Sequence, residues 1–142
     1  MTTLVLDASV LLKWFLPEHP GEEHVAVALA LQTAFARGHV TLLQPPHATA
    51  EVLAVLARLR PASAAADLAD LMDYRWPQRE DELVYQRALR LSIDLNHHLF
   101  DTLYHALALE TPGAVFVTAD RRYFDKARSH GAIAWLAAFP LP

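Results

Sequence analysis

Residues 3–14, TLVLDASVLLKW, place an aspartate between two apolar runs. The first run is short, almost entirely apolar and rich in strand-forming residues, which predicts a strand buried on both faces. The second run has the length of a short helix. A buried strand that leads directly into a helix is typical of α/β proteins with a parallel sheet. The stretch therefore predicts this fold class and places Asp7 at the carboxyl end of the first strand.

The rest of the chain continues this alternation of strands and helices. Strands are predicted over 3–7, 40–44, 114–118 and 132–136, and helices over 8–15, 22–38, 46–59, 63–75, 80–95, 98–110 and 121–130. Because the strands are nearly all apolar and helices separate them, we expect an α/β fold, a three-layer α/β/α sandwich with a central, mostly parallel sheet. The length is that of one ordinary domain, so residues 1–142 are expected to form a single domain.

The composition excludes several classes of protein. The chain has 142 residues, no cysteine and a formal net charge of -4. The absence of cysteine excludes disulfides and thiolate chemistry. No apolar run approaches the roughly 18 residues of a membrane span, and no basic leader precedes Leu4, so we expect a cytoplasmic protein. The net negative charge argues against a globally basic surface, so a polyanion would have to meet a local basic patch.

Four acids are candidates for a functional site. Asp7 and Asp120 follow predicted strands, and the crevice of an open parallel sheet lies beyond the carboxyl ends of its strands. Glu51 and Asp101 lie in predicted helices among apolar neighbours. Each acid also has a structural alternative. Asp7 and Asp120 could cap the helices that follow them. Asp101 could be stabilised by the dipole of its helix, and Glu51 could be an ordinary solvated side chain.

Four motifs, in their order and separations, resemble those of PIN domains. They are DASVLLKW at 7–14, PHATAEVLAVL at 46–56, FDTLYHALAL at 100–109 and VTADRRYF at 117–124. More specifically, the chain resembles the VapC-like ribonuclease toxins of bacterial type II toxin–antitoxin systems, and the resemblance spans nearly its whole length. It implies that the four acids converge on Mg²⁺ or Mn²⁺ to cleave RNA, with Ser9 and Thr118 as the accompanying hydroxyl residues. His105 and Thr102 stand where the family more often has apolar or small residues.

Carboxylate chemistry leads to the same expectation by a separate route. Two carboxylates about 4 Å apart repel by roughly 4 kcal/mol at an effective dielectric of 20, so four ionised acids in one place require a cation. A hard divalent ion such as Mg²⁺ or Mn²⁺ prefers oxygen ligands and can activate water for phosphodiester hydrolysis. We therefore expect a metal-dependent endoribonuclease.

Each acid then has an expected role. Asp7 and Asp120 would be the most direct metal ligands, and Asp101 would complete or bridge the site. Glu51 would bind the metal through water or orient the attacking water. The hydroxyls of Ser9 and Thr118 would steady the carboxylates, although capping or ending a strand is an equal alternative for each.

Two alternatives to this site remain open. His97, Asp101 and His105 share a helical stripe at four-residue spacing, and histidines at that spacing can bind zinc. A domain of the same fold could also act as a catalytically idle RNA-binding or scaffold module. An aspartyl phosphatase is disfavoured, because it needs a second aspartate where the chain has Ser9.

The remaining expectations concern partners. Lys13, Arg121 and Arg122 follow the acids at 7 and 120 and could contact RNA phosphates, with ordinary solvated charges as the alternative. The resemblance implies a homodimer and a small antitoxin protein that brings a basic side chain toward the acids. The apolar stretch VAVALALQTAF at 25–35 is the candidate surface for such a partner, and a deeply buried helix is the alternative.

Overall fold

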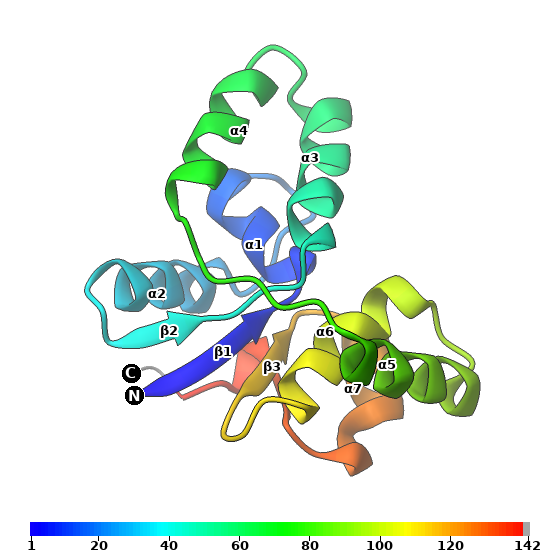
Figure 1. The fold of residues 1–142 in the computed structure, drawn as a ribbon. Coiled ribbons are helices and arrows are strands. Elements are labelled where there is room, and N and C mark those ends of the chain that lie inside the picture. The colour runs from blue at the N-terminus through cyan, green and yellow to red at the C-terminus, as the bar shows by residue number, and fades with distance from the viewer. Residues whose placement is uncertain (141–142) are drawn as a thin grey trace.

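The computed structural model describes residues 1–140 and is built around a four-stranded sheet (Figure 1). The strands are β1 (Thr2–Leu6), β2 (Val40–Leu42), β3 (Val115–Thr118) and β4 (Ile133–Trp135). Their spatial order is β2-β1-β3-β4, and every neighbouring pair is parallel. The predicted α/β class is confirmed, and the sheet is entirely rather than mostly parallel.

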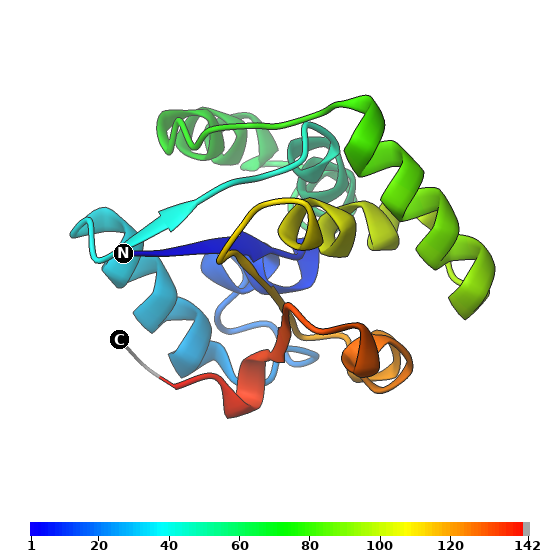
Figure 2. The ribbon, with the colours of Figure 1, turned by 60° about the horizontal axis from the view of Figure 1, so that its bottom comes forward.

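Helices cover both faces of the sheet (Figure 2). They are α1 (Ala8–Phe15), α2 (Val25–Ala36), α3 (His47–Leu59), α4 (Ala64–Asp73), α5 (Glu82–Leu95), α6 (Leu99–Leu109) and α7 (Arg121–Ala127), with short 3₁₀ turns η1 (Arg128–His130) and η2 (Leu136–Ala138). Helices α1 and α2 lie on one side of the sheet, and α5 and α6 lie on the other. Within residues 1–140, no helix has both the length and the apolar character needed to cross a membrane.

The core is centred on β1, because this strand has a neighbour on each edge and a helix on each face. Leu4, Val5 and Leu6 are all 0 % exposed. Helix α6 packs directly on β1 and β3 and is itself covered by α5. Consequently 102–108 is a continuous buried run, which is unusual for a helix and includes two polar side chains, Thr102 and His105.

A buried side chain completes the hydrogen bonding at the carboxyl end of β1. Gln44 is 0 % exposed, and its Nε2 donates to the Leu6 carbonyl at 2.8 Å while its Oε1 accepts from the Leu6 N–H at 2.7 Å. The amide therefore takes the place of a strand residue where β2 has already ended. The next N–H, that of Asp7, donates to the Val117 carbonyl on β3 at 3.1 Å. The backbone that carries Asp7 is thus fixed on both sides.

The largest differences from the predicted elements lie at their ends. Helix α2 begins at Val25 rather than at 22, because His24 has a left-handed backbone with φ of 55° and Glu22 is held by Lys13. The predicted strand 40–44 stops at Leu42, since Gln44 joins the sheet through its side chain.

The stretch 25–35, expected as a partner surface, is mostly covered within the chain. Helix α2 packs on α1 and β2, and none of its side chains is among the large apolar side chains exposed within 1–140. Besides Met1, those exposed side chains are Leu59, Leu68, Met72, Leu83, Tyr85, Leu89, Ile93 and Phe100. The apolar surface open to a partner therefore lies on α3, α4, α5 and the start of α6, because the large side chains of α2 fill the space beside β2.

Candidate active site

Asp7 lies at the carboxyl end of β1, with its carboxylate held by two hydroxyls. Thr118 Oγ1 donates to Asp7 Oδ2 at 2.7 Å, and Ser9 Oγ donates to the same oxygen at 3.0 Å. The Asp7 side chain makes no capping bond to a backbone N–H of α1. The structural alternative for Asp7 is therefore not realised, and its Oδ1 makes no hydrogen bond with residues 1–140.

The environment of Asp7 disfavours its charge. The pKa of the Asp7 carboxyl is raised to about 6, chiefly by burial and also by the negative charges of Asp101 and Glu51, against the lowering effect of the two hydroxyls. Two acids that are distant in sequence thus act on Asp7 through space.

Glu51 projects from α3 and is held by groups that the local sequence pattern did not reveal. Tyr104 Oη on α6 donates to Glu51 Oε1 at 2.6 Å, and His47 Nε2 lies 3.3 Å from the same oxygen. Burial and the charges of Asp7 and Glu51 raise the pKa of Tyr104, so its hydroxyl keeps its proton and remains a donor. His47 lies four residues before Glu51, one turn earlier on the same face of α3.

Asp101 and Asp120 form a third cluster together with His97. One ligand atom from each of the three side chains lies within 4.8 Å of the other two, a separation that one metal ion can bridge. His97 Nε2 lies 2.8 Å from Asp101 Oδ2. Lys126 Nζ lies 3.3 Å from His97 Nδ1, and because an ammonium can only donate, the imidazole proton lies on Nε2 and is donated to Asp101.

Asp120 has a structural role as well. Its Oδ1 accepts from the Tyr123 N–H at 3.1 Å and caps α7, as the capping alternative predicted. Its own N–H donates to Thr118 Oγ1 at 3.0 Å. Thr118 therefore bonds to both acids at the ends of β1 and β3, and its side chain is buried for this reason.

The four acids consequently lie near the carboxyl ends of β1 and β3, and among residues 1–140 only Asp101 and Asp120, with His97, bring ligand atoms close enough to share one ion. Asp101 connects Asp7 with Asp120, because its charge raises the pKa of Asp7 and its carboxylate shares a ligand-atom cluster with Asp120. The negative charges of Asp7, Glu51 and Asp101 all contribute to the raised pKa of Tyr104. The donor set is rich in carboxylate oxygens, which suits a hard divalent cation, and it includes one imidazole nitrogen.

The comparison with protein-family models gives one match, to the PIN domain, over residues 4–129. This chain belongs to the PIN domain family. PIN domains are generally metal-dependent nucleases, so a nucleic acid is the substrate that the family implies. A search of curated proteins found no match.

Of the three basic residues expected at the nucleic-acid surface of this PIN domain, Lys13 makes a largely buried ion pair and Arg121 makes an exposed one. Lys13 is only 5 % exposed, and its Nζ lies 2.7 Å from Glu22 Oε2 in a buried ion pair. This pairing makes Lys13 unavailable to a phosphate. Arg121 pairs with Asp125 at 3.0 Å and lies over the Trp135 ring.

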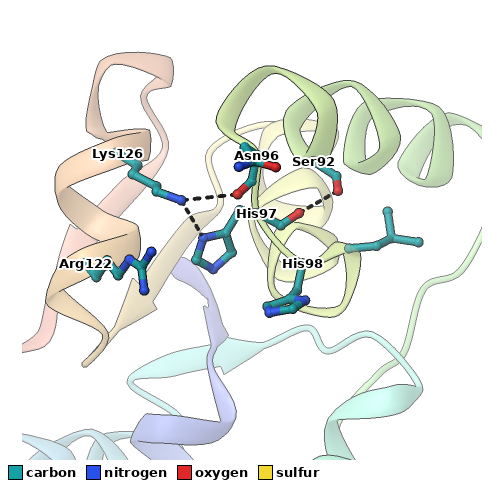
Figure 3. Close-up of a pocket in the computed structure, with 7 residues that line it drawn as sticks. Ser92, Asn96, His97, His98, Arg122 and Lys126 are labelled. Carbon is teal, nitrogen blue, oxygen red and sulfur yellow. Dashed lines mark hydrogen bonds between the residues drawn. The ribbon is translucent and has the colours of Figure 1, made fainter.

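Arg122 lines a cavity beside the acids of the PIN domain (Figure 3). The cavity has a volume of about 410 Å³ and is lined by Ser92, Asn96, His97, His98, Leu99, Arg122 and Lys126. Figure 3 shows Arg122 and Lys126 projecting from α7 toward His97 and Asn96. Because none of the lining residues is acidic, this cavity offers a local basic patch in a chain whose net charge is negative.

The two histidines of the predicted zinc site, His97 and His105, have different surroundings in the fold. His105 is 0 % exposed, and its Nδ1 bonds to Tyr123 Oη at 2.9 Å while its Nε2 bonds to the Gly131 carbonyl at 2.7 Å. Burial lowers the pKa of His105 to about 4, so the ring is neutral. The zinc alternative that paired His105 with His97 is therefore wrong, because both nitrogens of His105 are occupied inside the core.

Thr102, the other departure from the family pattern, also has a structural explanation. Its Oγ1 donates to the Ala88 carbonyl on α5 at 2.9 Å, which joins α5 to α6. The hydroxyl therefore serves the packing of these two helices.

Proposed function

We propose that this PIN domain is a divalent-metal-dependent endoribonuclease that hydrolyses RNA phosphodiester bonds, with residues 1–142 acting as one nuclease domain. The observation that supports this most strongly is the electrostatic coupling of Asp7, Glu51 and Asp101, together with the ligand-atom cluster that joins Asp101 to Asp120. Acids gathered in this way raise the free-energy cost of ionising one another, and a cation relieves it.

The residues present fit Mg²⁺ or Mn²⁺. Asp7, Asp101 and Asp120 would hold the ion directly, and the oxygen-rich set matches the preference of both metals. A bound divalent ion supplies a water of lowered pKa and offsets the negative charge that develops on the phosphate. His97 would offer a nitrogen ligand only after its Nε2 exchanged the hydrogen bond to Asp101 for the metal. Because a nitrogen ligand suits transition metals better than Mg²⁺, the metal assay should include Mn²⁺ and Zn²⁺.

The protein's own groups would position the reactants. Glu51 is fixed by Tyr104 and His47 and would orient the attacking water through its carboxylate. Ser9 and Thr118 hold Oδ2 of Asp7, so Oδ1 would be the oxygen that holds the ion. Arg122 and Lys126 would bind an RNA phosphate in the cavity beside Asp101.

The direct test is RNA cleavage by the purified protein in Mg²⁺, Mn²⁺ or Zn²⁺. We expect cleavage with Mg²⁺ or Mn²⁺ that EDTA abolishes and that is lost in Asp7→Asn. Asp94→Asn is the matched control, because this carboxylate is exposed on α5 and lies outside the acid cluster. RNA binding without cleavage in any metal would favour the alternative of a catalytically idle RNA-binding or scaffold module. Failure to bind or cleave RNA would refute both.

We propose further that the protein is a cytoplasmic toxin of a toxin–antitoxin pair and forms a homodimer. The resemblance to VapC-like proteins supports the toxin role, and the exposed apolar side chains of α3, α4 and α5 offer surface for an antitoxin or a second copy. Induced expression in bacteria should arrest growth with the parent chain and not with Asp7→Asn. Normal growth with abundant, RNA-cleaving parent protein would argue against the toxin role.

A further inference from the structure

A second cavity lies beside the acid site, and its character is the opposite of the basic one. It has a volume of about 350 Å³ and is lined by Pro45, Pro46, His47, Arg79, Glu80, Val84, Tyr85, Leu99, Phe100 and Leu103. Most of these side chains are apolar or aromatic. Its size falls in the range of cavities that bind small ligands.

Two aromatic rings of this cavity are exposed. Phe100 is 61 % exposed and Tyr85 is 41 % exposed, although both lie next to other apolar groups. The Tyr85 hydroxyl donates to Glu80, which holds this ring at the edge of the cavity. Exposed aromatic faces beside a polar site are the feature that proteins use to stack unpaired bases.

The cavity is joined directly to the acid site. His47 Nε2 bonds to the Phe100 carbonyl at 2.7 Å and lies 3.3 Å from Glu51 Oε1. The His47 ring lies between those of Phe100 and Tyr104, with centroid distances of 5.8 and 4.7 Å. Phe100 itself immediately precedes Asp101 in α6. A group bound against Phe100 is therefore adjacent to the acids.

Leu99 lines both the apolar cavity and the basic cavity. The two cavities thus lie on either side of the first turn of α6, with cations in one and aromatic rings in the other. A nucleotide chain has the same two parts, an anionic phosphate and a flat base, whereas an apolar peptide side chain matches only the second cavity. Continuity with the acid site and with the basic cavity favours a nucleotide as the occupant.

We propose that the apolar cavity binds one unstacked base of the RNA, on a nucleotide next to the cleaved phosphate, with Phe100 as its main stacking surface. The proposal rests on the proposed ribonuclease function and adds a base-binding subsite to it. The subsite would act on unpaired RNA, because a base inside a duplex cannot reach the ring.

The test compares Phe100→Ala with Phe100→Trp, each in the Asp7→Asn background so that bound RNA is not cut. Binding of a labelled single-stranded RNA is measured by fluorescence anisotropy in Mg²⁺. We expect Phe100→Ala to bind about tenfold more weakly and Phe100→Trp to bind as tightly as the parent, because base stacking on an aromatic ring is sequence-tolerant. The fluorescence of the new tryptophan should also be quenched on RNA binding.

Ile93→Ala is the matched control. Ile93 is 71 % exposed and lines a cavity of similar volume, about 340 Å³, formed by Gln86, Leu89, Arg90, Ile93 and Asp94 on α5 alone. Its removal should leave RNA binding unchanged. An RNA carrying one abasic nucleotide next to the cut should bind the Phe100→Ala variant and its parent equally.

The failures of the two proposals are distinguishable. If the parent chain cleaves RNA but adding Phe100→Ala to Asp7→Asn leaves RNA binding unchanged, the base subsite is overturned and the cavity is left for a protein side chain. An equal loss in Phe100→Ala and Ile93→Ala would also overturn it. If the parent chain neither binds nor cleaves RNA, the ribonuclease function fails and the subsite fails with it.

Discussion

Replacement of Asp7 by asparagine should make the metal-free protein more stable while removing its activity. Asparagine has nearly the same shape, and its Oδ1 can accept from the two hydroxyls that now bond to Asp7. The substitution therefore removes the charge and little else. An acid retained at a site where it destabilises the fold is expected for a functional residue.

The magnitude follows from the pKa of Asp7, which is raised from 3.8 to about 6. Two pKa units correspond to about 3 kcal/mol. Because the folded state binds this proton more tightly than the unfolded state, the associated stabilisation is complete below about pH 4 and is lost as the pH rises through about 6. At about pH 8 the parent chain lacks this stabilisation, whereas the asparagine variant does not titrate. The variant should therefore be more stable there by up to about 3 kcal/mol.

The assay is urea unfolding followed by circular dichroism, in EDTA, at several pH values between about 4 and 8. The difference in unfolding free energy between Asp7→Asn and the parent should be largest at high pH and vanish near pH 4. Excess Mn²⁺ should then stabilise the parent by a few kcal/mol, and the variant much less. Asp94→Asn, a solvent-exposed substitution, should leave both behaviours unchanged.

An asparagine variant no more stable than the parent at about pH 8 would refute this reasoning. So would a stability difference that does not change with pH, because the effect would then come from packing rather than from charge.

Further predictions concern the groups around the acids. Thr118→Val removes a buried hydroxyl that donates to Asp7 and accepts from a backbone N–H, so urea unfolding should show a loss of about 1 to 3 kcal/mol together with a higher pKa of Asp7. Tyr104→Phe removes the donor to Glu51, and steady-state cleavage kinetics should show a fall of about tenfold or more with metal affinity unchanged; an unchanged rate would contradict the role given to Glu51. The pKa of His105 is lowered to about 4, so its neutral form stabilises the fold above about pH 6.5 and this contribution, up to about 3 kcal/mol, is lost as the pH falls toward 4. His105→Gln should therefore give a flatter loss of stability over that range, and an unaltered pH dependence would show that the ring titrates freely.

The alternation of strands and helices was predictable because it depends on local patterns. Each strand is a short apolar run and each helix an amphipathic or apolar segment of ordinary length, so their existence and order follow from residue spacing. The ends were less predictable. The left-handed backbone of His24 and the side-chain pairing of Gln44 depend on groups elsewhere in the fold, and no local spacing indicates them.

The acids and the two hydroxyls that hold Asp7 could be identified from the sequence, but the tyrosine that holds Glu51 could not. Asp7 and Asp120 follow strands, and parallel topology alone brings the ends of such strands together. The donor from Tyr104 to Glu51 joins residues 53 positions apart, which no periodicity predicts. His47 could have been found, because it lies one helical turn before Glu51.

The basic residues were hardest to assign for a general reason. A long cationic side chain can reach many partners, so its sequence position leaves its contacts open. Lys13 turns inward to Glu22, whereas Lys126 lies beside His97 in the basic cavity.

The amide of Gln44 has a consequence for how the chain can vary. Since one side chain closes the edge of β1, the main chain after Leu42 is free to leave the sheet and to carry Glu51 toward the acids from a separate helix. The same side chain ties the two acids together. Gln44 belongs to the segment between β2 and α3, so a shift of this segment would pull on the Leu6 backbone next to Asp7. A residue outside the catalytic centre thus restricts how this segment can change in length or position.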